Sequence, residues 1–260
     1  MNEGLNDQPV LMVEGLEVSY RSFKVLKNLS FSVNSGSCLT VMGSSGCGKS
    51  TLMKALIGLI KPSKGLIKYA EADLWNDRNQ MNEQLLSNFG VLFQGSALWS
   101  SMTIFENVAL PLETFTNLSV KEIREVVNYK LSLVGLYGLD GRYPSELSGG
   151  MQKRAGLARA LAMDPKILFL DEPSAGLDPV NSRSLDELII QLKQTLGVTF
   201  LVISHDIESI FSISDEAIFL SDKIKGIVAR GNPRNWRIDC EHSEISNFLS
   251  GDKGNDLFNQ

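Results

Sequence analysis

A glycine-rich run near the N-terminus has the residue types that bind phosphate. The pattern G-x-x-x-x-G-K-[ST] is matched by Gly43, Ser44, Ser45, Gly46, Cys47, Gly48, Lys49 and Ser50. Glycines let the backbone turn tightly, so several N–H groups can point at one anion. A helix that begins near Lys49 would add the positive end of its dipole. The Lys49 ammonium could then reach the β- and γ-phosphates of a nucleotide, and the Ser50 hydroxyl could ligate Mg²⁺.

Two carboxylates follow an apolar run in the second half of the chain. Asp171 and Glu172 come directly after the residues Ile167, Leu168, Phe169 and Leu170. At the end of a buried strand, Asp171 is expected to hold Mg²⁺ through its water shell, and Glu172 to polarise an attacking water. The alternative is that the pair only caps the end of the strand.

A second glycine motif could bind another anion. Ser148, Gly149 and Gly150 precede a helix that we expect over Gln152–Met163, and a helix start with glycines favours anions. One chain does not need two triphosphate sites. Two chains that face each other head-to-tail would use both motifs on opposite sides of each nucleotide. The alternative is that Ser148 simply caps the helix.

Composition restricts the class of protein. The chain has 260 residues, 43% of them hydrophobic, and 25 basic against 30 acidic residues give a net charge of −5. This is ordinary globular composition, and a mildly acidic chain is a poor candidate for nucleic-acid binding. Three cysteines without metal-ligand spacing suggest a reducing compartment. Without an apolar run of about 18–20 residues or a secretory leader, we expect a soluble, cytosolic chain that reaches a membrane through a partner.

Alternating hydrophobic patterns define the elements that must position these motifs. Strands are expected over Val10–Tyr20, Leu29–Val33, Leu39–Met42, Gly65–Tyr69, Lys166–Leu170 and Thr199–Ile203, and helices over Ser50–Leu59, Val120–Leu136, Gln152–Met163 and Ser182–Leu196. Strands that alternate with helices favour an α/β fold with a parallel sheet. The helical middle third indicates an insertion into that sheet.

The motifs, together with Gln94 and His205, resemble the ATPases of ATP-binding-cassette (ABC) transporters in their order and spacing, from about Val13 to Trp236. The resemblance implies a RecA-like P-loop NTPase core, made of a mostly parallel sheet with flanking helices and an antiparallel β subdomain. It places this core at residues 1–93 and 165–236. An inserted α-helical subdomain is expected at residues 94–164. The C-terminal tail, residues 237–260, is left as a possible contact with a partner or with a second ATPase.

The same resemblance implies roles for single residues, with ATP and Mg²⁺ as cofactors. The catalytic residues are Lys49, Gln94, Glu172 and His205, and the metal-binding residues are Ser50, Gln94 and Asp171. The remaining nucleotide contacts are Tyr20, the phosphate loop with Thr51, Ser148, Gly149, Gly150 and Asp178.

Plainer roles are open for several of these residues. Tyr20 would stack on adenine, but it could be an ordinary strand aromatic, and Phe23 is an alternative stacker. Gln94 could be a solvated loop residue. Asp178, which would bridge a dimer interface, could be a helix cap. Cys47 could be an inert small residue or, at a helix N-terminus, a thiol of lowered pKa.

Several stretches resemble one branch of the family, the Mla/MCE-type lipid transport ATPases. They are Phe93–Leu98, Phe105–Leu112, Leu147–Arg154 and Gly176–Ile189. This resemblance implies transport of phospholipids between bacterial inner and outer membranes, with the ATPase at the cytoplasmic face of the inner membrane. The implied partners are a second copy, a multi-span permease, a periplasmic MCE-domain protein and sometimes a small STAS-domain subunit, and no nucleic acid.

Other transport classes share the same core. Amino-acid importers and lipoprotein-release systems are the main alternatives, and a soluble ABC ATPase without a transport role is a further one. The segment Gly95–Val108 is unusually apolar for a loop. It could belong to the core of the helical insertion or line a groove that receives a short permease helix, and both could hold for different residues.

Overall fold

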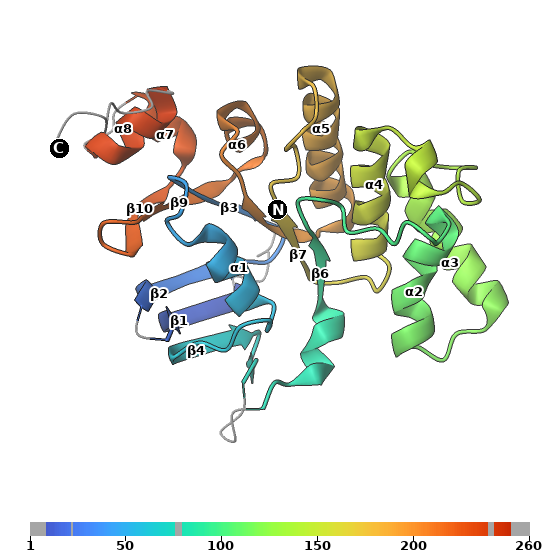
Figure 1. Cartoon of the computed structure of the whole chain (residues 1–260), viewed down its shortest axis with the longest axis horizontal. Helices are drawn as coiled ribbons and strands as arrows, with labels where there is room; N and C mark the ends of the chain where they lie inside the picture. Colours follow the sequence, from blue (N-terminus) through green and yellow to red (C-terminus); the bar gives the residue numbers. More distant parts are fainter. Residues whose placement is uncertain (1–8, 22, 76–79, 239–241, 251–260) are drawn as a thin grey trace, which may run out of the picture.

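The central element is a six-stranded, mostly parallel sheet. The computed structural model describes residues 9–21, 23–75, 80–238 and 242–250. In this part of the chain the strand order is β10-β9-β3-β8-β7-β6, with only the β9–β10 pair antiparallel (Figure 1). The bounds are β3 Cys38–Gly43, β6 Phe89–Leu92, β7 Ile167–Asp171, β8 Thr199–Ile203, β9 Glu216–Ser221 and β10 Gly226–Gly231.

A second, antiparallel sheet packs against the first. Its order is β2-β1-β4-β5, with bounds β1 Pro9–Tyr20, β2 Phe23–Asn34, β4 Lys64–Tyr69 and β5 Ala72–Asp73. Inward residues of β1, such as Val13, Leu16 and Val18, share one buried cluster with the helix α1, Lys49–Leu56. The expected run Val10–Tyr20 is thus one strand. Helix α1 ends at Leu56, before the predicted Leu59, and Gly58 follows in the left-handed region at φ 80°.

The two faces of the parallel sheet bury different partners. Successive side chains of a strand point to opposite faces, and β7 follows this rule. Ile167 and Phe169 lie in the cluster that contains α1, whereas Leu168 and Leu170 lie in the cluster that contains α4, Gly149–Ala160. Helices α1 and α4 therefore cover opposite faces of the sheet.

The helical middle third is built around α4. It contains α2, Ile104–Phe115, and α3, Val120–Leu133, which pack on α4 (Figure 1). A short 3₁₀ segment, η1 Glu83–Asn88, precedes β6, and another, η2 Pro144–Glu146, lies between α3 and α4. Helix α3 confirms the predicted helix, although it ends three residues before Leu136.

Helix α2 is absent from the predicted elements. It begins at a capping box in which the Glu106 amide donates to Thr103 Oγ1 at 3.2 Å, and Glu106 Oε2 accepts from the Thr103 amide at 2.6 Å. Ile104 and Val108 of the apolar segment are fully buried, whereas Trp99 is exposed. The core interpretation of this segment therefore holds for α2, and the exposed part precedes the helix.

The C-terminal helices close the other end of the sheet. Helices α5, Pro179–Leu196, and α6, Ile207–Ile213, lie beside each other, and α7, Pro233–Ile238, and α8, Ser243–Ser250, follow β10. Ile245 of α8 is fully buried in a cluster with Met42 and Phe219. Part of the predicted tail is thus the helix α8, which packs on the core, and its residues 239–241 and 251–260 lie outside the described residues.

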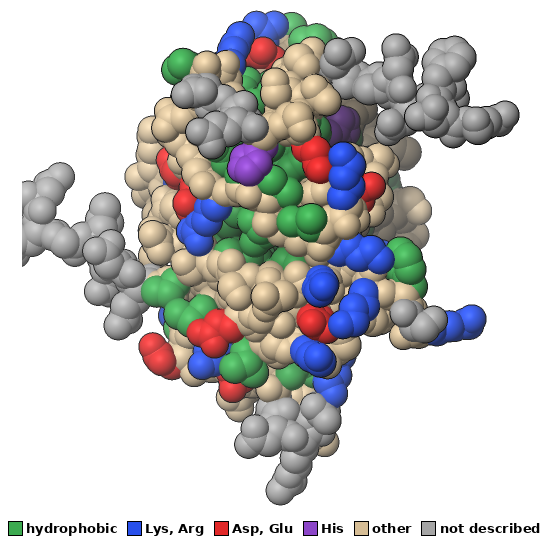
Figure 2. Space-filling view, turned by 90° about the vertical axis from the view of Figure 1, so that its left-hand side faces the viewer, with side chains coloured by type: hydrophobic (Ala, Val, Ile, Leu, Met, Phe, Trp, Pro, Cys, Tyr) green, Lys and Arg blue, Asp and Glu red, His purple; other side chains and the backbone are tan. Residues whose placement is uncertain are grey.

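Figure 2 shows basic and acidic side chains interspersed on one face of the molecule.

A buried carboxyl group joins α5 to α6. Asp186 is 4% exposed, and the Ser209 hydroxyl donates to its Oδ1 at 2.6 Å. Burial raises the pKa of Asp186 to about 6, the Ser209 hydrogen bond opposes this rise, and the charges of Asp206 and Glu187 add to it. Burial therefore favours the protonated, neutral form of the Asp186 carboxyl group over the charged form.

Asp186→Asn should flatten the pH dependence of stability. An unfolded Asp titrates near 3.9, so the folded state binds the extra proton between about pH 4 and 6. The contribution of Asp186 to the free energy of unfolding is then largest at low pH, and it falls by about 3 kcal/mol as the pH rises through that window. Urea unfolding across this range measures the slope. Glu113→Gln, at an exposed position of α2, should keep the wild-type slope; an unchanged slope in Asp186→Asn would contradict the assignment.

Candidate active site

The predicted chemical groups lie at one edge of the parallel sheet. The phosphate loop follows β3, Gln94 follows β6, Glu172 follows β7 and His205 follows β8. These strands run parallel and are neighbours in the order β3-β8-β7-β6. The carboxyl ends of parallel strands meet at the same edge, which is where ligands of open α/β sheets bind.

The phosphate loop needs its glycines for two separate reasons. Gly43, Gly46 and Gly48 have φ values of 148°, 82° and 106°, which L side chains rarely adopt. A Cβ at Gly43 would also lie 2.2 Å from the Leu220 carbonyl oxygen, whereas one at Gly46 would meet nothing within 4 Å. The loop is therefore both turned and pressed against β9, and it leads directly into α1 at Lys49.

The Lys49 ammonium folds back over the loop. It donates to the carbonyl oxygens of Gly43 at 2.8 Å and Ser44 at 2.9 Å. A phosphate would compete with these neutral carbonyls, because bonds between two charged groups are stronger. Ser50 and Thr51 lie in the first turn of α1, next to the same loop.

Cys47 corrects one expectation. Its side chain is 2% exposed, and burial raises the pKa of the thiol, an effect that the charge and hydrogen bonds of Lys49 oppose only in part. The alternative in which this pKa is lowered is wrong, because desolvation of the thiolate outweighs the charge and hydrogen bonds of Lys49. The structure favours the inert, packing role for Cys47.

Glu172 and His205 are in direct contact. His205 Nδ1 lies 2.7 Å from Glu172 Oε2, which makes an ion pair when the imidazole is protonated, and among the described residues Glu172 Oε2 has no hydrogen-bond partner. The Glu172 side chain is 13% exposed and that of His205 is 66% exposed. The backbone of Glu172 is in the left-handed region at φ 48°, and its amide donates to the Ile203 carbonyl at 2.9 Å. Two strand ends thus fix the carboxylate toward the histidine.

Asp171 and Gln94 supply oxygen atoms beside this pair. Burial raises the pKa of Asp171, the charge of Glu172 adds to the rise, and the cations Lys54, Lys153 and Lys49 oppose it. Carboxylate, amide and hydroxyl oxygens are the ligands that Mg²⁺ prefers, and it is commonly held by one or two carboxylates and substrate phosphates. Within the described residues there is no cluster of three His, Cys, Asp or Glu that could hold a metal alone. The donor set fits Mg²⁺ bound with a nucleotide.

The second glycine motif lies at the start of α4, on the opposite face of the sheet from α1. The Met151 amide donates to Ser148 Oγ at 3.3 Å, so Ser148 is the helix N-cap. Since α4 and α1 cover opposite faces of the sheet (Figure 1), the two glycine motifs of one chain start on separate helices of separate layers. The capping role is confirmed, and binding of a nucleotide by Gly149 and Gly150 stays a prediction.

Asp178 and Tyr20 have plain local surroundings. Asp178 caps α5 by accepting from the amides of Val180 at 3.0 Å and Asn181 at 3.1 Å. Tyr20 is 48% exposed at the end of β1, and Phe23 is exposed with the Lys225 ammonium 4.0 Å from its ring centre. Both aromatic side chains are accessible, and the dimer and adenine contacts stay predictions.

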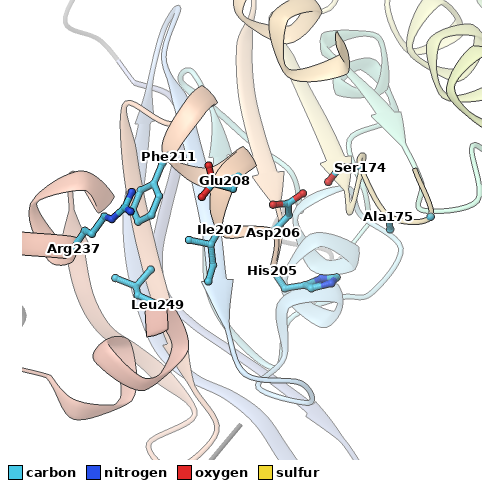
Figure 3. A pocket seen from close by; sticks show the side chains of 10 residues that line it. Ser174, Ala175, His205, Asp206, Ile207, Glu208, Phe211, Arg237 and Leu249 are labelled. Carbon is cyan, nitrogen blue, oxygen red and sulfur yellow. The ribbon is translucent and has the colours of Figure 1, made fainter. Parts of the chain in front are cut away.

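A cavity of about 610 Å³ opens beside His205. Figure 3 shows His205 pointing toward Ala175, with Phe211 and Arg237 next to each other on the far side. The cavity is lined by Ser174, Ala175, Gly176, His205, Asp206, Ile207, Glu208, Phe211, Arg237 and Leu249. The exposed ring of His205 therefore borders this cavity.

One residue of the site is not marked by any sequence pattern. The Lys153 ammonium is buried and donates to the backbone carbonyl oxygens of Gln94 and, at 3.4 Å, of Glu172. Burial lowers the pKa of Lys153, and the charges of Asp171 and Glu172 oppose this shift. In the sequence Lys153 stands beside Gln152 and Arg154 and looks like a solvated position, so only the fold shows that it is buried.

Fold and site together define a nucleoside triphosphatase of the phosphate-loop class. The family described as ABC transporter matches residues 26–175. Over 239 residues the chain is 38% identical to Mkl of Mycobacterium tuberculosis, named a probable ribonucleotide transport ATP-binding protein; this covers 92% of the chain and 66% of Mkl. Over 242 residues it is 36% identical to MlaF of Haemophilus influenzae, an intermembrane phospholipid transport system ATP-binding protein; this covers 91% of the chain and 90% of MlaF.

Solved structures agree with this assignment. CbiO1 from Clostridium perfringens, part of the ABC transporter complex cbiONQ, has a TM-score of 0.81 and 28% identity, covering 89% of this chain and 92% of cbiO1. The dimeric ATP-binding cassette MJ0796, bound to ADP and Pi, has a TM-score of 0.75 and 27% identity, covering 85% of this chain and 98% of MJ0796.

The chain belongs to the ABC transporter family and carries its ATP-binding cassette. The predicted fold class and the resemblance to Mla-type ATPases are confirmed. Among the described helices, none has both the length and the apolar composition that a bilayer crossing requires.

Gly43→Ala and Gly46→Ala should separate the two constraints on the phosphate loop. Both variants place a side chain at positive φ, which costs about 1–2 kcal/mol. Only Gly43→Ala also forces a Cβ against the backbone of β9. We expect it to lower the unfolding free energy by at least about 2 kcal/mol more than Gly46→Ala and to weaken ATP binding at least about tenfold more. Urea unfolding and titration with a fluorescent ATP analogue measure both effects; equal losses in the two variants would contradict this account.

Proposed function

We propose that the chain is the ATP-hydrolysing subunit of a transporter that moves phospholipids between bacterial inner and outer membranes. The observation that carries the ATPase part is the 2.7 Å contact between Glu172 and His205, at the sheet edge that also holds the Lys49 loop. The lipid part is supported by the likeness to MlaF over nine-tenths of both chains.

The site residues divide the work of phosphoryl transfer. Lys49 and the loop amides bind the β- and γ-phosphates, and Glu172 accepts a proton from the water that attacks the γ-phosphorus. His205 orients the Glu172 carboxylate and lies near enough to contact the γ-phosphate. Ser50, Asp171 and Gln94 would hold Mg²⁺, which neutralises charge on the phosphate oxygens when it is bound. Tyr20 stacks on the adenine.

Two copies assemble head-to-tail around two ATP molecules. The separation of the two glycine motifs on opposite faces of one sheet supports this arrangement, since one chain then offers each nucleotide only half of its contacts. Ser148, Gly149 and Gly150 of one copy contact the γ-phosphate held by Lys49 of the other, and Asp178 lies at the interface. Hydrolysis removes the γ-phosphate that both copies bind. The closed dimer then loses the contacts that stabilise it relative to the open state, and it opens.

A groove beside the helical subdomain is the proposed seat of the permease. It has a volume of about 380 Å³ and is lined by Leu86, Ser87, Phe89, Gly90, Val91, Leu110, Pro111, Thr114, Phe115, Arg159, Ala160 and Met163. It thus lies beside the apolar segment 95–108 rather than within it. Its apolar lining between η1, α2 and α4 fits a short amphipathic helix. The inserted segment 94–164 would then transmit the opening of the dimer.

The transporter context follows from the branch. The ATPase would sit at the cytoplasmic face of the inner membrane, held by a multi-span permease, with a periplasmic MCE-domain protein and possible STAS-domain subunit as further partners. The tail at 237–260 would contribute a partner or dimer contact. Mkl is named for ribonucleotide transport and the chain spans only 66% of it, so a nucleotide substrate is the alternative to be tested.

Affinity purification from native membranes separates these assignments. The tagged chain is purified in mild detergent, and mass spectrometry identifies its proteins and small molecules, with membranes that contain the untagged chain as the control for non-specific carry-over. We expect a multi-span permease, an MCE-domain protein and phospholipid enriched over the control. A solute-binding protein with an amino-acid permease, bound ribonucleotide without lipid, or no membrane protein at all would overturn the lipid assignment.

A further inference from the structure

Lys153 is a buried cation that pairs with carbonyl oxygens instead of a carboxylate. Its residue is 5% exposed, and it donates to the backbone oxygens of Gln94 and Glu172. Within the described residues, no Asp or Glu lies within ion-pair distance of its ammonium. Burying a charge without a partner of opposite sign costs free energy, and apolar residues of similar size pack such positions at least as well. Packing alone therefore does not account for a lysine here.

The two carbonyls that Lys153 binds belong to the two loops that matter most for the chemistry. Gln94 begins the loop after β6, and Glu172 is the proposed base after β7. Both loops contain residues at positive φ, namely Glu172 at 48° and Ser96 and Ala97 at 61° and 48°. Non-glycine residues hold such conformations only where surrounding contacts over-determine them.

The same face of α4 holds the loop after Gln94 at two further points. Arg159 donates to the carbonyls of Ala97 at 2.8 Å and Ser96 at 3.0 Å. At Gly156 an added Cβ would lie 3.2 Å from the Ser96 oxygen and 2.7 Å from Leu92 Cδ1, so the helix passes close to the loop. Of the three residues, only Lys153 also reaches the loop that carries Glu172.

We propose that Lys153 is a positioning residue that ties the start of α4, where the second copy's ATP would bind, to Gln94 and Glu172 of its own chain. The proposal rests on the head-to-tail dimer given above. Lys153 lies five residues after Ser148, about 7.5 Å along a rigid helix. A nucleotide that shifts the start of α4 would therefore also shift Lys153 and the backbone carbonyls of Gln94 and Glu172 to which it donates.

Substitution of Lys153 tests the proposal, because its side chain touches backbone and not phosphate. Lys153→Met keeps the length and removes the charge, and Lys153→Arg keeps the charge. We expect Lys153→Met to lower kcat at least about tenfold with KM and the Kd for a fluorescent ATP analogue within about threefold of wild type. Lys153→Arg should restore much of kcat.

Arg154→Met is the matched control. Arg154 is the next residue of α4, and it too donates to buried backbone oxygens, those of Val134 at 2.9 Å and Ser184 at 3.3 Å, but it does not touch either catalytic loop. Thermal unfolding of both variants measures the structural loss that they share. A kcat loss in Lys153→Met that Arg154→Met equals, or a kcat within twofold of wild type, would overturn the proposal. An inactive wild-type chain would instead overturn the proposed ATPase function.

Discussion

The arrangement of the site depends on four parallel strands that end at the same edge of one sheet. The register of β3, β8, β7 and β6 brings together the predicted phosphate loop, a carboxylate pair and a histidine that are far apart in the sequence. Strands β3, β7 and β8 are almost wholly apolar and buried, as expected when helices cover both faces. The burial of these strands therefore also fixes the positions of the loops that carry the predicted site residues. Within those loops, backbone strain is confined to residues at positive φ, such as Glu172.

The sheet also separates functions by its two faces. Side chains of β7 point alternately to α1, which follows the phosphate loop, and to α4, which follows the second glycine motif. A single chain thus keeps its two glycine-rich helix starts on opposite faces of the sheet, which is consistent with the proposed site shared between two copies. Lys153 then offers a physical link within each copy, from the helix that faces the second nucleotide to the base of the first.

Sequence patterns predict some parts of this protein and not others for physical reasons. The phosphate loop and the motif at Asp171 are local, because their chemistry is carried by consecutive residues, and the strands follow from simple apolar runs. Helix α2 is missed because its apolar start and Pro111 obscure the helical period, although the Thr103–Glu106 capping box was a usable signal. Two further properties depend on burial between segments that are distant in the sequence, and residue spacing does not encode this burial. They are the raised pKa of the Cys47 thiol and the hydrogen bonds from Lys153 to the Gln94 and Glu172 carbonyls.

The measurement that tests the central claim most directly is the association state of Glu172→Gln with nucleotide. Removing the base should block hydrolysis while leaving the phosphate contacts, so sedimentation velocity with Mg²⁺ and ATP should show a stable dimer that ADP does not support. Wild type should form this dimer only transiently. A variant that stays monomeric while saturated with ATP, or that hydrolyses ATP at the wild-type rate, would contradict the shared site and the role of Glu172.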